Sequence, residues 1–266
     1  MQRNKRVSWW QEHLRRMGAA YLVLVISLVP TLLAYLRVRE NAFERDRERF
    51  EQVARAKEDA LERRLVRYAD EVVSLGGFFA ANEAIDVGEW NRLVRSIALT
   101  ERFPGFHALG FAEYVPPGAR AAHEARWRSQ GLAGYTIHPA GPREDFSPVV
   151  LLSPADTSVP GLDAFSVLAL RPTLEQVRDT GVTAVSVPAA FPRPDAKPAR
   201  VAFIHPVYSS GKPSSTPAER QAALRGYVFG VLDLDRLFDG VFGSSGDQLV
   251  HAELFAGQRE DPAELI

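Results

Sequence analysis

The hydrophobic pattern begins with one long apolar run. Residues 18–36 are nineteen consecutive residues without a charged side chain. At about 1.5 Å of rise per residue, a helix of this length extends roughly 28 Å, close to the hydrocarbon thickness of a bilayer. The run therefore predicts a transmembrane helix, preceded by a short terminus at residues 1–17.

Two other interpretations of this run are a cleaved signal peptide and a buried core helix. The run is longer than the apolar region of about 7–15 residues in signal peptides, and no small-x-small cleavage site precedes Arg37. A core helix with nineteen uncharged residues is unusual, so an uncleaved anchor is favoured. Five basic residues precede the run and five follow it closely, so the positive-inside rule does not orient the chain.

A second pattern, with helical periodicity, covers residues 37–81. Apolar or small residues recur there at steps of mostly three and four, which places them on one face of a helix. This stripe consists of Phe50, Ala54, Leu61, Leu65, Tyr68, Val72, Leu75 and Phe79. We expect the helix to end at Gly76-Gly77 or near Asn82. Pairing with a second copy through the stripe predicts a dimeric stalk, and partial packing on the chain's own domain is the alternative.

From residue 82 onward, short strand patterns alternate with short helical patterns, which predicts an α+β domain of PAS-like layout over residues 82–256. The expected strands cover residues 106–115, 135–138, 148–152, 182–187, 201–208, 226–232 and a last one from 248 to 255. The expected helices cover residues 118–130, 170–180, 217–224 and 235–242. Gly181 would end the second of these helices, Asp235 would cap the last, and Pro206 suggests a sheet edge or a strand exit.

Composition and motifs argue against several classes of function. The net charge of −1 gives no basic field for nucleic acid, and the absence of cysteine excludes disulfides and thiolate sites. The sequence contains no G-x-S-x-G, Walker A or G-x-G-x-x-G motif, and its six histidines lack metal-ligand spacing. Asp233 and Asp235 form a D-x-D pair, but helix capping explains Asp235 better than a metal. We expect no catalytic residues, no metal and no cofactor.

Asp163 has two interpretations on chemistry alone. It follows a long loop, residues 153–162, and lies between Leu162 and Phe165. A carboxylate in these surroundings suits a partly buried acceptor for the N–H groups of a small ligand. It equally suits the N-cap of a helix. The nearby Arg143-Glu144-Asp145 segment is most simply a solvated turn.

From residue 103 onward the chain resembles a CHASE domain, the extracytoplasmic sensor of histidine kinases and nucleotide cyclases. The resemblance rests on the order of FPGFHALGFAEYV (103–115), DFSPVVLL (145–152), GLD (161–163), RDTG (178–181), FIHPVY (203–208), AxxGYVxG (223–230) and VLDLDRL (231–237). It covers roughly residues 85–256 and implies tandem PAS-like units on a long N-terminal helix. It also implies a cytoplasmic N-terminus, a cell-membrane location and a periplasmic or extracellular sensor.

The resemblance also implies a ligand site. In the plant members, which are cytokinin receptors, an aspartate after a loop holds the adenine ring, and a gapless match places this position at Asp163 and an apolar pocket position at Val185. The expected ligand-binding residues are Asp163, Leu162, Phe165, Leu151, Val185 and Phe203. Leu162 stands where bacterial relatives usually have an aromatic residue, so the match leaves open whether the ligand is adenine-type.

We therefore expect the ligand-sensing portion of a transmembrane receptor, dimeric through the stalk helix. Its output module, a histidine kinase or a diguanylate cyclase, is expected beyond residue 266, with residues 257–266 as a truncated end. The alternative is a membrane-anchored dimerisation or interaction module that binds no small molecule.

Overall fold

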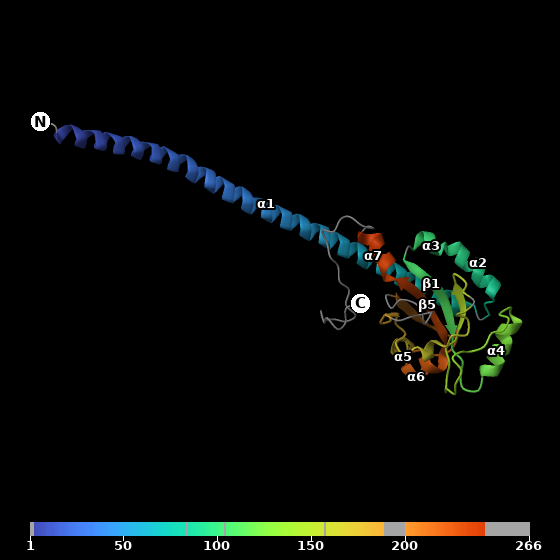
Figure 1. Cartoon of the computed structure of the whole chain (residues 1–266). Coiled ribbons are helices and arrows are strands. Elements are labelled where there is room, and N and C mark those ends of the chain that lie inside the picture. Colours follow the sequence, from blue (N-terminus) through green and yellow to red (C-terminus); the bar gives the residue numbers. More distant parts are fainter. Residues whose placement is uncertain (1–2, 83, 104, 157, 189–199, 243–266) are drawn as a thin grey trace. The chain divides into compact units, whose positions relative to one another are not determined.

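The computed structural model describes residues 3–82, 84–103, 105–156, 158–188 and 200–242. These residues form seven α-helices, one short 3₁₀ helix and one five-stranded antiparallel sheet (Figure 1). The chain separates into two units, residues 1–56 and 57–266, and each is described by itself. The α+β class expected from the sequence is confirmed.

The first helix, α1 (Arg3–Ala81), contains both the apolar run at residues 18–36 and the predicted stalk. Gly76 and Gly77 do not end it, because both are accommodated inside the helix. It ends at Ala81, where the Asn82 side chain donates to the Phe78 carbonyl over 2.8 Å. No helix in the described part of the chain has an apolar stretch that meets the length and hydropathy needed to cross a bilayer.

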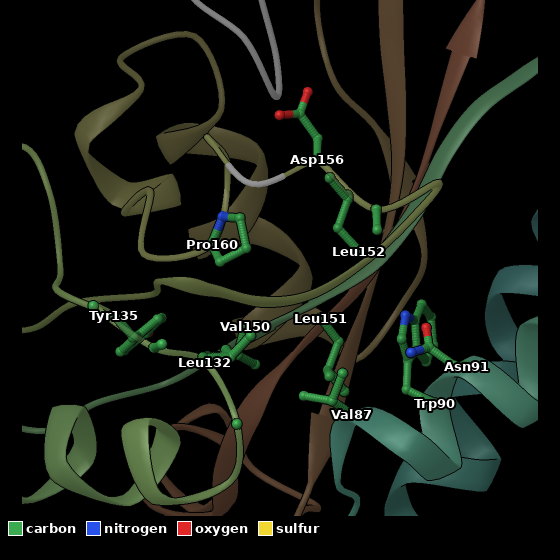
Figure 2. Close-up of a pocket in the computed structure, with 14 residues that line it drawn as sticks. Val87, Trp90, Asn91, Leu132, Tyr135, Val150, Leu151, Leu152, Asp156 and Pro160 are labelled. Atoms are coloured by element: carbon green, nitrogen blue, oxygen red, sulfur yellow. The ribbon is translucent and has the colours of Figure 1, made fainter.

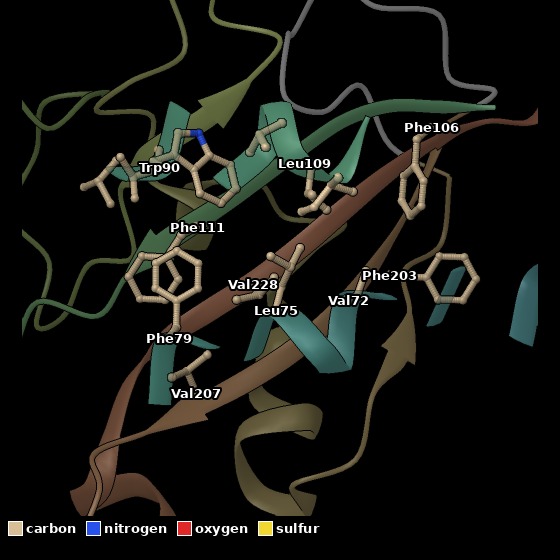
Figure 3. Packing of buried hydrophobic residues seen from close by; sticks show 14 of the residues in the cluster. Val72, Leu75, Phe79, Trp90, Phe106, Leu109, Phe111, Phe203, Val207 and Val228 are labelled. Carbon is tan, nitrogen blue, oxygen red and sulfur yellow. The ribbon is translucent and has the colours of Figure 1, made fainter. Parts of the chain in front are cut away.

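The C-terminal half of the apolar stripe belongs to the core of the domain. Tyr68, Val72, Leu75 and Phe79 are all buried and belong to the core on one face of the sheet. Figure 3 shows Val72, Leu75 and Phe79 against the sheet. Phe50, near the other end of the stripe, is 47 % exposed. Leu61 and Leu65 are partly buried against the same core. Packing on the chain's own domain therefore explains the stripe from Leu61 onward, and Phe50 is its exposed large residue.

The sheet has the strand order β2-β1-β5-β4-β3, and every neighbouring pair is antiparallel. The strands are β1 (Phe106–Glu113), β2 (Val149–Ser153), β3 (Ala184–Val185), β4 (Arg200–Tyr208) and β5 (Leu224–Asp233). Four of the expected strands are confirmed in position. Pro206 of β4 lies beyond the two-residue ladder with β3 but is still paired with Tyr227 of β5, so it is at a sheet edge, one of its two expected places, and not at a strand exit.

Both faces of the sheet are covered, and the alternation of side chains along each strand assigns every residue to one face. The first face carries Leu109, Phe111 and Val228 and packs against α1 and against α2 (Val87–Ile97). The second face carries Tyr227 and Phe229 and packs against α5 (Arg171–Thr180) and the 3₁₀ helix η1 (Ala164–Ser166). The central strands are therefore buried on both sides.

Local capping signals set most of the remaining helix ends. The α2 helix begins with a capping box between Asp86 and Glu89, and Gly181 ends α5 in the left-handed conformation, as expected. The other helices are α3 (Leu99–Arg102), α4 (Arg120–Ser129), α6 (Pro217–Ala223) and α7 (Leu234–Phe242). The cap of α7 is Asp233, whose Oδ1 accepts from the Arg236 N–H, so the assignment to Asp235 is wrong by two residues.

Three further sequence-based predictions differ from the structure. Residues 135–138 form no strand, because their single ladder contact is the bridge between His138 and Leu162. The strand expected over 182–187 shortens to Ala184–Val185. One sheet, not the two PAS-like units, is present among the described residues; the strand expected at 248–255 lies outside them.

Candidate functional site

Asp163 is fully buried, and its hydrogen bonds and ion pair connect three segments of the chain. Its Oδ1 accepts hydrogen bonds from the N–H of Ser147 (2.7 Å) and from the N–H of Phe165 (3.1 Å). Its Oδ2 lies 3.0 Å from Nε of Arg143 in an ion pair that lacks the alignment of a hydrogen bond. Its own N–H donates to the His138 carbonyl over 2.8 Å. The helix-cap interpretation is thus confirmed, since Phe165 lies in η1.

Burial and the bonded partners of Asp163 have opposite effects on its pKa. Burial raises the pKa of the Asp163 carboxyl, and the Ser147 and Phe165 N–H groups together with the Arg143 charge oppose this rise. The Arg143 guanidinium also donates to the Pro139 carbonyl over 2.7 Å. Arg143 is therefore part of this cluster, and the interpretation of residues 143–145 as a merely solvated turn is wrong for it.

Two further buried polar groups, one bonded to Asp163 through its backbone and one on the same face of the sheet, have spare hydrogen-bonding capacity. The Ser147 Oγ and the Tyr227 hydroxyl are buried and make no hydrogen bond to the described residues. The Ser147 backbone is bonded to Asp163, and the Tyr227 ring lies 6.1 Å from the ring of Phe165 in an edge-on contact. Because buried polar groups in folded proteins are nearly always satisfied, this cluster is suited to a polar ligand atom or water.

The six expected ligand-binding residues do not form one site. Leu162, Asp163 and Phe165 lie together with the second face of the sheet. Leu151 and Phe203 belong to the core on the first face, and Val185 is 48 % exposed at the sheet edge. The reason is the two-residue period of a strand. The neighbours that reach the second face are Leu152 in β2 and Ala202 and Ile204 in β4.

A cavity of about 290 Å³ opens at the β2 edge of the sheet (Figure 2). It lies between α2, the loop at residues 131–135 and the segment that follows β2. Of the six expected residues, Leu151 alone lines it. No local sequence pattern predicts this cavity, because its walls come from three segments that are far apart along the chain.

A buried polar cluster joins α4 to β1. His123 Nε2 lies 2.9 Å from the Tyr135 hydroxyl, and Trp127 Nε1 donates to Glu113 over 2.7 Å. Arg126 also pairs with Glu113. Burial lowers the pKa of His123 to about 4, although Glu113 nearby acts in the opposite direction. The imidazole is therefore neutral near pH 7, and the cluster positions α4 rather than holding a metal. Among the described residues, no group of three histidine or acidic side chains could hold one.

A comparison with known protein families identifies the larger part of the chain. Residues 83–266 match the family model described as CHASE domain. A search of curated proteins gives no match. The matched region begins directly after α1 and includes the sheet, the Asp163 cluster and the β2-edge cavity.

Proposed function

Because this chain belongs to the CHASE domain family, we propose that it is the ligand-sensing portion of a transmembrane receptor that transmits binding through α1. CHASE domains are extracytoplasmic sensors of small ligands, typical of receptor histidine kinases and cyclases, and are not themselves catalytic. The output module is accordingly a histidine kinase or a diguanylate cyclase, and the sensor domain is periplasmic or extracellular.

The Asp163 cluster is the observation that supports a ligand on the second face of the sheet. Ser147 Oγ and the Tyr227 hydroxyl each offer a donor and acceptors, while Asp163 Oδ2 has only its ion pair with Arg143. A planar nitrogen heterocycle of the adenine type presents N–H donors to the carboxylate and ring nitrogens to the hydroxyls. Leu162 and Phe165 supply apolar surface beside these groups.

Adjacent residues of β5 support the transmission to α1. Tyr227 belongs to the second face with Phe165, whereas Val228 belongs to the first face with Val72 and Phe79 of α1. A ligand that displaces Tyr227 therefore changes the packing of α1 through the same strand. Such a ligand alters signalling only if it binds one arrangement of α1 more tightly than another.

Membrane attachment and dimerisation complete the proposal. We place the membrane anchor in the uncharged run at residues 18–36 from the length and composition of the sequence alone, since no described helix meets the requirements of a membrane span. Phe50 and Val53 remain 47 % and 39 % exposed on α1, and an exposed apolar pair on a long helix suits pairing with a second copy. Two copies joined there would respond together to a change in α1.

A second candidate function is an interaction module without a small ligand. Its support is that Asp163 is fully buried and already bonded to Ser147, Phe165 and Arg143. In that case the carboxylate has a purely structural role, and the exposed pair of Phe50 and Val53 on α1 would provide the function through dimerisation.

Calorimetric titration of the full chain in detergent micelles with N6-isopentenyladenine separates these two functions. The sensor proposal predicts saturable heat for the wild type, loss of that heat in Asp163→Asn, and retention in Glu144→Gln. Glu144 is the matched control because it is an exposed carboxylate in the segment next to Arg143. Far-UV circular dichroism of each variant verifies folding. No heat from the folded wild type would remove the adenine-type ligand and leave either a different ligand or the interaction module.

A further inference from the structure

We propose that His205 of β4 is a proton switch that loosens the packing of α1 on the sheet in acid. The imidazole lies in the contact between β4 and α1, on the face of the sheet that also carries Phe203 and Val207 (Figure 3). The consequence for signalling rests on the proposed transmission through α1, whereas the effect of the proton on the packing of α1 does not.

The imidazole of His205 is held between two segments of the chain. On one side, a Cβ at Gly76 of α1 would be 2.4 Å from His205 Cδ2 and 3.0 Å from Nε2, so the ring lies against the helix backbone. On the other side, Nδ1 lies 2.9 Å from the hydroxyl of Thr183, the residue before β3. The ring therefore has little room to move away from α1 when its charge changes.

The elements around His205 provide no counter-charge for an imidazolium. Four stretches without an acidic, lysine or arginine side chain pack or pair there: residues 72–81 of α1, 180–188 around β3, 201–208 of β4 and 226–232 of β5. Two of these stretches contain a tyrosine, but Tyr208 and Tyr227 belong to the second face of the sheet. The charged residues that flank the stretches are Glu71, Asp179, Arg200, Arg225 and Asp233.

The balance of burial and charge gives the direction of the switch. Burial lowers the pKa of His205, and no charged group of the described residues compensates this effect. The folded domain therefore favours the neutral imidazole. The packing that depends on it is fully present above the usual histidine pKa of 6.5 and is lost as the pH falls from 6.5 through the lowered pKa.

The position of His205 connects the proton to the proposed signal. His205 pairs with Val228 of β5, the residue through which a ligand on the second face is proposed to act on α1. A proton and that ligand would thus act on the same packed layer. CHASE domains are extracytoplasmic, so His205 meets the pH of the exterior. Acid outside the cell would therefore release the last turns of α1 without any ligand.

The test follows His205 and α1 separately in the full chain, in detergent micelles and without ligand. NMR of the chain labelled with ¹⁵N-histidine gives the pKa of the imidazoles, and His205→Gln assigns the His205 signal among the six histidines. Hydrogen exchange at residues 72–81, corrected for the intrinsic effect of pH, measures the packing of α1. The proposal predicts a His205 pKa below 6.5 and at least a threefold loss of protection at residues 72–81 between pH 7.5 and pH 5.

Two variants locate the effect. His205→Gln keeps a polar side chain but cannot gain a proton, so its protection at residues 72–81 should stay constant between the two pH values. His123→Gln is the matched control, because it removes a buried histidine whose partner is Tyr135, and it should lose protection as the wild type does. Far-UV circular dichroism verifies the folding of both variants.

Three results overturn the switch: a His205 pKa of 6.5 or above, an equal loss of protection in His205→Gln and the wild type, or a loss that extends equally to β1 and β5. The last of these would be global unfolding instead of a local release of α1. Because no ligand is present, a failure of the switch is distinguishable from a failure of the ligand site, which calorimetry with N6-isopentenyladenine tests separately.

Discussion

Gly76 of α1 lies directly against the imidazole of His205 in β4, so closely that a Cβ at residue 76 would be 2.4 Å from His205 Cδ2. The imidazole is held from its other side, where Nδ1 lies 2.9 Å from the Thr183 hydroxyl. A glycine at this place thus lets the helix approach the sheet closely enough to bury Val72 and Phe79. It explains why a residue that disfavours helix is present inside α1.

This contact predicts opposite effects for two neighbouring substitutions. Gly76→Ala should lower the free energy of unfolding by about 1–2 kcal/mol, because overpacking outweighs the gain in helix propensity. Gly77→Ala should raise it by roughly 0.5–1 kcal/mol, since a Cβ there meets nothing within 4 Å. Urea denaturation followed by circular dichroism measures both. Equal effects of the two substitutions would contradict the close approach at residue 76.

The buried pair of Asp163 and Arg143 predicts a strong coupling. Asp163→Ala should lower the free energy of unfolding by about 3 kcal/mol, because it removes the acceptor for two N–H groups and leaves Arg143 without its counter-charge. Arg143→Met should lower the free energy of unfolding by less than Asp163→Ala does, since the Ser147 and Phe165 hydrogen bonds to Asp163 persist. A double-mutant cycle with urea denaturation gives the coupling between the two residues. If the changes in the free energy of unfolding caused by the two substitutions were strictly additive, the ion pair would contribute nothing to stability.

Stability should depend on pH through His123. Its folded-state pKa of about 4 lies below the usual histidine pKa of 6.5, so the folded chain holds the neutral imidazole. The resulting stabilisation is fully present above pH 6.5 and is lost as the pH falls from 6.5 toward 4, by up to roughly 3 kcal/mol. The groups around the imidazole are Glu113 from β1, Glu124 and Arg126 from α4, and Tyr135.

Denaturation midpoints measured between pH 4.5 and 7.5 test this dependence. His123→Gln keeps a polar side chain but cannot titrate, so its midpoint should vary much less across this range. A wild type and a variant with parallel pH profiles would show that other groups cause the loss of stability in acid.

The exposed end of the apolar stripe predicts the site of self-association. Phe50→Arg should weaken the dimer at least tenfold, because Phe50 is the exposed aromatic residue of the stripe. Val66→Arg is the control, since Val66 is 53 % exposed and lies outside the stripe. Sedimentation equilibrium in detergent micelles measures both. A dimer that tolerates Phe50→Arg would place the contact elsewhere.

Local patterns predicted the elements whose signals lie close together in the sequence. The end of α5 at Gly181 and the positions of β1, β4 and β5 follow from turn residues and apolar runs. The α2 helix was not predicted, although Asp86 and Glu89 carry the spacing of a capping box. Tyr135 and Ile137 are buried at alternate positions, a pattern that is typical of a strand although these residues do not form one.

The site was predicted less completely because it depends on contacts between distant segments. Asp163 was identified, whereas Arg143 joins it only through the fold of the intervening loop. Leu151 and Phe203 lie in correctly predicted strands but on the opposite face, a distinction that one residue of register decides. The β2-edge cavity and the contact between His123 and Tyr135 have no local signal at all.

Hydrogen exchange of α1 tests most directly whether the Asp163 face communicates with the helix. Backbone exchange of the full chain is measured with and without saturating N6-isopentenyladenine, in the wild type and in Asp163→Asn. The sensor proposal predicts slower exchange both at residues 145–165 and at residues 68–81 of α1, with neither change in the variant. Slower exchange confined to residues 145–165, or an unchanged wild type, would contradict transmission across the sheet.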